Sequence, residues 1–154
     1  MTYRCLSVEA VAAFEPDPEN FQRLTLYARS LPEAYCFPCG AGAGVAQVRF
    51  AAGQDMASHI SSSGDETIQL VGLDQAIPGF RPNLIKMDVE GAEPDALLGA
   101  RRLIATHRPG LAISAYHEPD HLWRIPLLIK ELCPEYELYL RCHSHSSFDL
   151  VVYA

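Results

Sequence analysis

Short apolar segments alternate with helix-like segments along most of the chain, and this alternation restricts the possible folds more than any other feature. The segments Val11–Phe14, Asn83–Asp88 and Gly110–Tyr116 have the length and composition of buried strands. Strands that are apolar on both faces and alternate with helices predict an α/β fold with a mostly parallel sheet. The length of 154 residues fits a single domain, residues 1–154.

The same patterns predict the remaining elements. Asp17 is a suitable N-cap and Pro18 a suitable first residue for a helix. Because proline is unfavourable inside a helix, the helix near Pro126 is expected to begin there and to end at Leu132. The other expected elements are helices at Leu73–Ile77, capped by Asp74, and from Pro94 to about Thr106, and strands at Ala34–Cys39, Gly44–Phe50, Thr67–Val71, Glu137–Cys142 and Phe148–Tyr153, the last two forming an antiparallel pair.

Polar residues gather where these strands end. Asp88, Glu90 and Glu93 lie within six residues after the apolar run LIKM, Glu15 follows the strand near the N-terminus, and His117 follows the strand near residue 110. Ligands of open parallel sheets bind beyond the carboxyl ends of the strands, so we expect chemistry here. Glu93 has an alternative structural role, since acidic residues also favour helix N-termini.

Composition narrows the possible partners and compartments. The net charge is −7, from 12 basic and 19 acidic residues, which argues against nucleic acid and an anionic membrane surface as partners. No apolar run approaches the roughly 20 residues of a membrane span, and the N-terminus lacks the pattern of a signal peptide. The five cysteines are odd in number and irregularly spaced, which favours free thiols in a reducing, cytoplasmic environment.

Four separated motifs together resemble the FkbM-like family of S-adenosylmethionine-dependent methyltransferases. In chain order they are AFEPDPENF, LIKMDVEGAE with a helix and HRP after it, LWRIPLLIKEL, and YLRCHS. The resemblance extends from about Val11 to Tyr153. It implies a Rossmann-like class I methyltransferase sheet, S-adenosylmethionine as cofactor, and O-methylation of a small-molecule or sugar hydroxyl.

One part of the family pattern has no counterpart in the sequence. The family begins with a strand that ends in a glycine-rich acidic loop, D-x-G-A-x-x-G, which approaches the methionine part of the cofactor. Only ten residues precede Val11, and they contain no glycine. The resemblance therefore predicts a sheet without its first strand, which would lie between the strands that end at Glu15 and Asp88.

The resemblance also assigns cofactor-binding residues. A carboxylate at the tip of a strand can accept hydrogen bonds from the two hydroxyls of a ribose, and Glu15 has this position, with Asp17 close by. Gly40, in the glycine-rich segment CGAGAG, corresponds to a turn near the adenine. Asp88 corresponds to the strand end that faces the methionine part, where a carboxylate stabilises the positive sulfonium.

The predicted catalytic residues are Asp88, Glu93 and His117. Transfer of a methyl group to a hydroxyl is helped by a base, and His117 has a near-neutral reference pKa. A metal is not predicted, because no ligand pair has a strong signature such as HExxH. If several of the acidic residues and histidines, including His121, converge, Mg²⁺, Mn²⁺ or Zn²⁺ stays a minor alternative, with a hydrolase-like use of the site.

A non-catalytic role is the main alternative function. A sheet without a central strand exposes two strand edges, and such edges favour pairing with another chain. The chain could then be a diverged interaction or oligomerisation module, including a homo-oligomer. For the enzyme, the expected partner is a small-molecule or carbohydrate acceptor.

Overall fold

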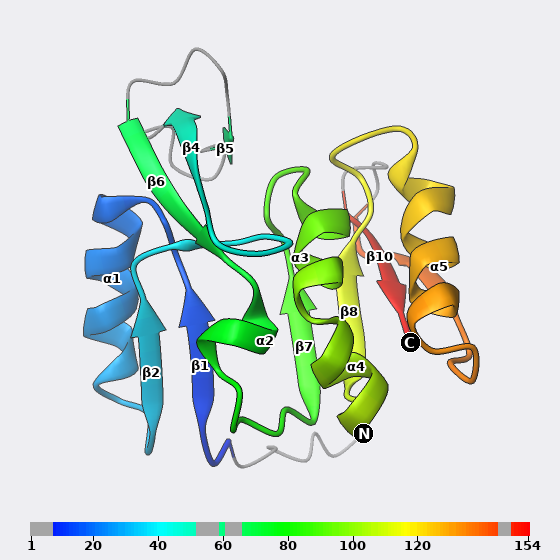
Figure 1. Cartoon of the computed structure of the whole chain (residues 1–154), viewed down its shortest axis with the longest axis horizontal. Helices are drawn as coiled ribbons and strands as arrows, with labels where there is room; N and C mark the ends of the chain where they lie inside the picture. The colour runs from blue at the N-terminus through cyan, green and yellow to red at the C-terminus, as the bar shows by residue number, and fades with distance from the viewer. Residues whose placement is uncertain (1–7, 52–58, 61–65, 145–148) are drawn as a thin grey trace.

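The computed structural model describes residues 8–51, 59–60, 66–144 and 149–154, and it has a mixed α/β fold (Figure 1). The described strands form three sheets. In spatial order, these are β1 (Val11–Phe14) and β2 (Ala34–Phe37); β7 (Leu84–Met87), β8 (Gly110–Ser114), β10 (Leu150–Tyr153) and β9 (Tyr139–Cys142); and β3 (Gly40–Ala41), β6 (Glu66–Val71), β4 (Ala46–Ala51) and β5 (His59–Ile60).

The prediction was a mostly parallel sheet with an antiparallel pair at the C-terminus, and the β1–β2 sheet and the sheet that contains β7 agree with it. β1 is parallel to β2 and β7 is parallel to β8, while β10 is antiparallel to both β8 and β9. The expected antiparallel pair at the C-terminus is thus confirmed, although Phe148 lies outside the described residues. The expectation of a mostly parallel sheet is too simple, because β4 joins β5 and β6 in antiparallel pairs.

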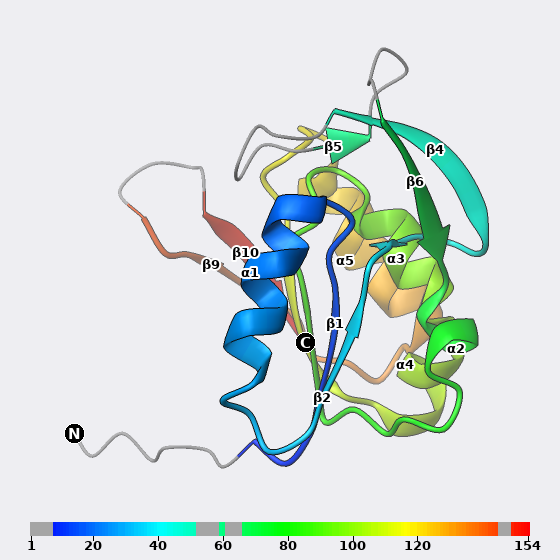
Figure 2. The ribbon, with the colours of Figure 1, turned by 90° about the vertical axis from the view of Figure 1, so that its left-hand side faces the viewer.

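Helices cover both sides of the strands. They are α1 (Pro18–Ala28), α2 (Leu73–Ala76), α3 (Glu93–Gly99), α4 (Arg101–His107) and α5 (His121–Leu132). Figure 2 shows α1 on one side of the strands and α3, α4 and α5 on the other. The main core lies where these three helices meet β7, β8 and β10, and its fully buried side chains include Leu97, Ile104, Leu111, Ile113, Ile125, Ile129 and Val152.

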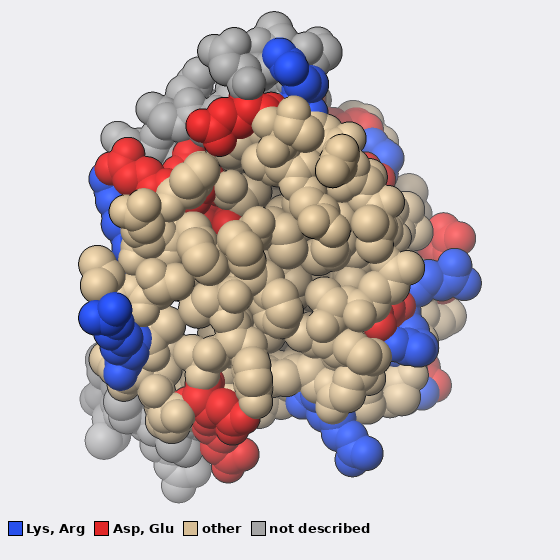
Figure 3. All heavy atoms as spheres, turned by 60° about the vertical axis from the view of Figure 1, so that its left-hand side comes forward, with Lys and Arg blue, Asp and Glu red and all other residues tan. Residues whose placement is uncertain are grey.

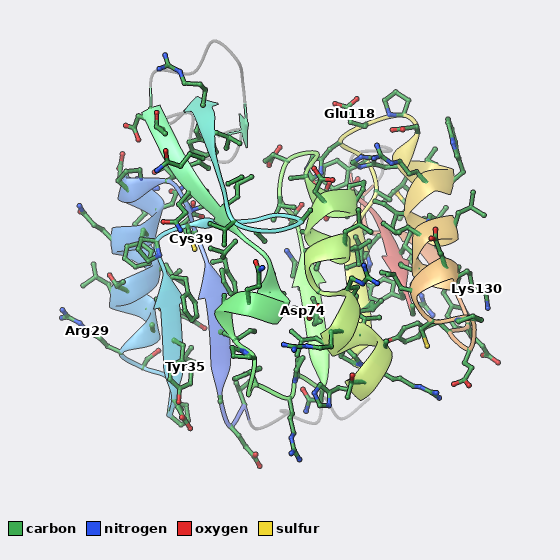
Figure 4. The ribbon with its side chains drawn as sticks, viewed as in Figure 1. Arg29, Tyr35, Cys39, Asp74, Glu118 and Lys130 are labelled. Atoms are coloured by element: carbon green, nitrogen blue, oxygen red, sulfur yellow. The ribbon has the colours of Figure 1, made fainter. Side chains whose placement is uncertain are left out.

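The helix predicted from Pro94 to Thr106 is interrupted at Ala100, which has φ −107° and ψ 7°. A Cβ atom on Gly99 would lie 1.9 Å from the carbonyl oxygen of Gly42, so only glycine permits this approach of the helix to the neighbouring backbone. Asp74, predicted to cap α2, instead accepts hydrogen bonds from the backbone N–H groups of Arg102 and Leu103 and thereby caps α4 (Figure 4).

Helix α5 begins five residues earlier than predicted and contains Pro126 in its interior. Proline removes one helical hydrogen bond and costs about 3 kcal/mol. The buried residues His121, Ile125 and Ile129 recur every four positions, and each buried isoleucine contributes about 1.5–3 kcal/mol. Burial of this face therefore outweighs the cost of the proline.

Three further features bear on the predictions from composition: the cysteines, the hydropathy of the helices and the surface charge. Cys36, Cys39 and Cys133 have free thiols, whereas Cys5 lies outside the described residues. Among the described helices, none has the length and hydropathy needed to cross a membrane. In Figure 3, uncharged residues cover most of the face that is shown, and lysine and arginine side chains lie at its margins.

Candidate active site

The candidate site is built where β7 and β8 end. These neighbouring strands are parallel, with Met87 opposite Ile113, so their carboxyl ends lie at the same edge. Asp88 follows β7 directly, and His117 follows β8 after a short extension. One oxygen of Asp88, one oxygen of Glu93 and one ring nitrogen of His117 lie within 4.8 Å of one another. The structure thus brings the three predicted catalytic residues together.

Glu93 lies at the centre of this cluster and is fully buried, with 0% exposure. It is the first residue of α3, but its carboxylate does not serve the helix as a cap. Oε1 accepts a hydrogen bond from the backbone N–H of Val89 (2.9 Å), and Oε2 accepts one from Gly91 (3.2 Å). Glu93 therefore ties the loop after β7 to the helix.

The His117 side chain is only 8% exposed and carboxylates lie beside both of its ring nitrogens. Nδ1 is 2.8 Å from Oε1 of Glu93, and Nε2 is 3.4 Å from Oε2 of Glu90 and 3.6 Å from Oδ1 of Asp88. Despite these distances, neither ring nitrogen forms a hydrogen bond with the described residues. The ring is thus a buried polar group that its neighbours do not fully satisfy.

His121 is a second buried imidazole at the same carboxylate. It is 1% exposed, and its Nδ1 lies 3.4 Å from Oε2 of Glu93 without forming a hydrogen bond. The sequence placed His121 only among possible metal ligands. Its four-residue spacing from Ile125 was the signal that could have placed it on the buried face of α5.

Asp88 is more accessible than Glu93 and contacts groups on both strands. Its Oδ1 accepts a hydrogen bond from the Tyr116 hydroxyl (3.1 Å), and its Oδ2 lies 3.2 Å from Nζ of Lys86. Burial alone would raise the pKa of Asp88, but the Ser114 hydroxyl, Lys86 and Tyr116 outweigh burial and lower it. Asp88 is therefore held as a carboxylate.

The buried pair of Glu93 and His117 stabilises its charged forms. Burial tends to raise the pKa of Glu93, but the His117 ring and the Val89 N–H group lower it overall. Burial tends to lower the pKa of His117, but Glu93, Glu90 and Asp88 raise it overall. Tyr116 has a pKa raised to about 12 by burial and by Asp88, so its hydroxyl keeps its proton.

The loop between β7 and α3 has an unusual backbone that directs Glu90 to His117. Glu90 has φ 51° and Gly91 has φ 99°, two successive residues with positive φ. Glycine tolerates this conformation, whereas a residue such as glutamate rarely adopts it. The local cost points to a functional reason for the position of the Glu90 side chain.

A second acidic strand end lies at β1. Asp17 is 2% exposed and is the N-cap of α1, as predicted, with its carboxylate accepting hydrogen bonds from the N–H groups of Glu19 and Asn20. Oε1 of Glu15 accepts a hydrogen bond from the backbone N–H of Asp17 (2.8 Å). The second oxygen of Glu15 forms no hydrogen bond within the described residues. Burial, followed by the neighbouring Asp17 charge, raises the pKa of Glu15 despite the bond from the Asp17 N–H.

Gly40 lies near this strand end, on β3. A Cβ atom at Gly40 would be 2.6 Å from Cδ2 of Leu70 and 3.8 Å from Cγ of Pro16. The sequence predicted a turn between strands for the segment from Cys39 to Gly44, and the segment does connect strands and is not followed by a helix. Glu15 and Asp88 follow strands of different sheets, and a crevice shared by both stays a prediction.

A concavity of about 350 Å³ lies on the C-terminal strand pair. It is lined by Tyr139, Arg141, His143 and Tyr153. The Tyr153 hydroxyl lies 2.8 Å from Nε2 of His143, and the backbone N–H of His143 donates to the carbonyl oxygen of Asp149. The Leu150 carbonyl accepts a hydrogen bond from the Ala115 N–H, so the His143 end of the concavity lies toward the carboxyl end of β8.

Comparison with known proteins identifies the family. The sequence model of the methyltransferase FkbM domain matches residues 1–146. The chain belongs to the FkbM methyltransferase domain family. The FkbM domain described here is similar to the crystal structure of methyltransferase FkbM from Methylobacillus flagellatus KT, with a TM-score of 0.77 and 34% sequence identity. No curated protein sequence matches the chain.

The match to the M. flagellatus protein includes nearly all of this FkbM domain but a minor part of that protein. It covers 94% of this chain and 36% of the other chain. The chain thus spans about a third of the length of the solved relative.

Proposed function

We propose that this FkbM domain belongs to an enzyme that transfers a methyl group from S-adenosylmethionine to a hydroxyl of a small molecule or carbohydrate. The observation that carries the proposal is the convergence of Asp88, Glu93 and His117 at the carboxyl ends of two parallel strands. Parallel α/β sheets place their ligand sites at this edge. Family membership supports methyl transfer as the reaction.

Glu15 is the residue that best fits the cofactor. One of its oxygens is held by the Asp17 N–H, and the other is free within the described residues to accept a hydrogen bond from a ribose hydroxyl. Asp17 is buried and engaged as an N-cap, so we assign it the supporting role of holding Glu15. Gly40 allows close packing near Pro16 and would border the adenine.

The division between two sheets is compatible with a Rossmann-like arrangement in which no strand of the described residues joins β1 to β7. β1 and β7 point in the same direction in Figure 1, but they belong to different sheets. We place the missing glycine-loop strand of the family between them. The same two edges are candidates for pairing with a second copy of the chain.

S-adenosylmethionine supplies an activated methyl group, and the protein must orient the acceptor in line with it. In our proposal, the ionised Asp88 faces the positive end of the cofactor. The neutral form of His117, or the Asp88 carboxylate, would accept the proton of the acceptor hydroxyl as its oxygen takes the methyl group from sulfur, while Glu93 keeps the His117 ring in position. The concavity around Arg141 and His143 would receive polar groups of the acceptor.

The partners and location follow from charge and composition. A net charge of −7 supports a small-molecule or carbohydrate acceptor over nucleic acid or an anionic membrane. The expectation of a cytoplasmic protein rests on the sequence and is part of this proposal.

Calorimetric titration with S-adenosylmethionine tests the proposal. The chain should be compared with a version extended at its N-terminus by a family-type strand and glycine loop, and with Glu15→Ala in both backgrounds. We expect the extension to strengthen binding and Glu15→Ala to weaken it by roughly 10–100-fold, because hydrogen bonds to a charged group are worth about 1.5–3 kcal/mol.

Glu19→Ala is the matched control, since Glu19 is an exposed acid on α1 that pairs with Arg23. Binding by this variant should equal that of the parent. If neither version binds the cofactor, the interaction-module alternative is favoured. If Glu15→Ala and Glu19→Ala bind equally well, the role of Glu15 is wrong.

A further inference from the structure

At the carboxyl ends of β7 and β8, some buried polar groups are not satisfied by hydrogen bonds within the described residues. Both ring nitrogens of His117 and Nδ1 of His121 are buried and have no hydrogen bond within the described residues. Buried polar groups in folded proteins are nearly always hydrogen-bonded, and exceptions call for a specific explanation. A ligand bound at this point is one such explanation.

Charge balance indicates which kind of ligand is missing. Asp88, Glu90 and Glu93 bring three carboxylates to His117, and a protonated His117 ring would balance only one of them. Among the described residues, Lys86 is a further cation at this group, and it contacts Asp88 at the surface. Glu93 is fully buried, whereas the side chains of Asp88 and Glu90 are 37% and 32% exposed. The three carboxylates therefore exceed the positive charge that these residues supply, and a bound cation would offset the excess.

The ligand distances suit a metal ion. One ligand atom from each of Asp88, Glu93 and His117 lies within 4.8 Å of the others. Two atoms bound to one ion at about 2.0–2.2 Å lie at most about 4.4 Å apart, so small side-chain movements complete the set. Glu90 is 3.4 Å from Nε2 of His117 and is available as a fourth ligand.

We propose that Asp88, Glu93 and His117 bind one divalent first-row metal ion, with Mn²⁺ and Zn²⁺ as the best matches to a mixed set of carboxylate and imidazole ligands. Binding of the ion does not require the cofactor. Its role in catalysis rests on the proposed function: with the ion bound, His117 would act as a ligand and the ion would take over the task of promoting loss of the proton from the acceptor hydroxyl.

Metal titration of the chelator-treated chain, without cofactor, tests the site. Calorimetry with MnCl₂ and with ZnCl₂ should show one ion per chain for at least one of the two metals, and the aqueous Mn²⁺ resonance signal should decrease in parallel. Asp88→Asn and His117→Ala should each weaken metal binding at least tenfold. Mutation of residues that only hydrogen-bond to metal ligands already lowers metal affinity by about 10–100-fold.

Glu118→Gln is the control, because Glu118 is an exposed acid on the loop before α5, at the same edge of the sheet (Figure 4). It should bind metal within twofold of the parent. Circular dichroism confirms folding of each variant, and Asp88→Asn, at a partly exposed position, gives a result even if His117→Ala unfolds. No binding of either metal at 1 mM, or binding unchanged in Asp88→Asn, would falsify the site.

Cofactor titration in the presence of chelator separates this result from the proposed function. A chain that binds S-adenosylmethionine but neither metal contradicts the metal site alone. A chain that binds metal through Asp88 and His117 supports the site even where the cofactor fails to bind.

Discussion

The two acidic strand ends have the same residue types but differ in how their buried groups are satisfied. At the end of β1, Asp17 accepts two backbone hydrogen bonds and Glu15 accepts one, all from the start of α1. At the end of β7, Glu93 is likewise hydrogen-bonded to backbone, but the buried rings of His117 and His121 are not. At the β1 end the buried Asp17 carboxylate is satisfied by hydrogen bonds from the chain itself, whereas at the β7 end the buried imidazoles are not.

This difference separates structural from functional polar groups better than residue type does. A buried carboxylate with backbone donors stabilises the local fold and needs no further partner. Buried imidazoles surrounded by carboxylates keep unused coordination and hydrogen-bonding capacity, which is available to a metal, a proton or a substrate. In the proposed function, the β7 end would therefore be the reactive end, and the β1 end would be a support that offers one Glu15 oxygen to the cofactor.

Removal of Glu93 should have the largest effect. Glu93→Ala leaves two backbone N–H groups and two buried imidazoles without their carboxylate. Breaking a buried ionic group of this kind costs about 3–5 kcal/mol. Urea unfolding at pH 7 should show this loss in the free energy of unfolding.

Asp88→Asn is the matched control for Glu93→Ala. Asp88 is partly exposed and its ion pair with Lys86 is at the surface, so the loss should be below about 1 kcal/mol. Equal losses in the two variants would show that Glu93 is not the buried centre of the cluster, and the contrast between the two strand ends would disappear.

The sequence predicted the residues of the site but not their roles. Apolar runs ending in carboxylates located Asp88, Glu93 and His117, because parallel neighbouring strands end at one edge. The burial of Glu93 could not be predicted, since it depends on the packing of α3 against α5. The burial of His121 was not predicted either, because the unfavourable Pro126 placed the predicted start of α5 after His121.

Fold prediction failed where tertiary contacts outweigh local preference. The break between α3 and α4 depends on Gly99 approaching Gly42, which is 57 positions away in the sequence, and no local pattern reports that contact. Asp74 has the position of a helix N-cap in its own segment, but it caps α4 through space. In contrast, the cap at Asp17 is local and was predicted correctly.

Asp17 provides the second prediction, of intermediate size. Asp17→Ala removes the side-chain acceptor for two N–H groups of α1 and should destabilise the chain by about 1–2 kcal/mol, measured by urea unfolding. Asp17→Asn keeps an acceptor at the N-cap and should recover most of the loss. Metal binding should be unchanged in both, because Asp17 caps α1 whereas the proposed ligands follow β7 and β8. Weaker metal binding by Asp17→Ala would show that the two strand ends are coupled.

Glu15→Gln should have the smallest effect, and its sign depends on pH. Burial raises the pKa of Glu15 above its usual value of 4.5, so ionisation is less favourable in the folded chain than in the unfolded chain. Stability due to this group is fully present below pH 4.5 and is lost as the pH rises through the folded pKa. Glutamine does not titrate, so the variant avoids this loss.

Thermal unfolding at pH 4 and pH 7 measures the effect. The variant and the parent should melt together at pH 4, and the variant should melt slightly higher at pH 7, by no more than about 2 °C because Glu15 is only half-buried. Glu19→Gln, on the exposed side of α1, controls for loss of a charge. A parent that is the more stable at pH 7 would mean that the Glu15 charge serves the fold. A more stable variant with weaker cofactor binding would instead show that the charge is kept for the ligand, and that the β1 end also has one group not needed for folding.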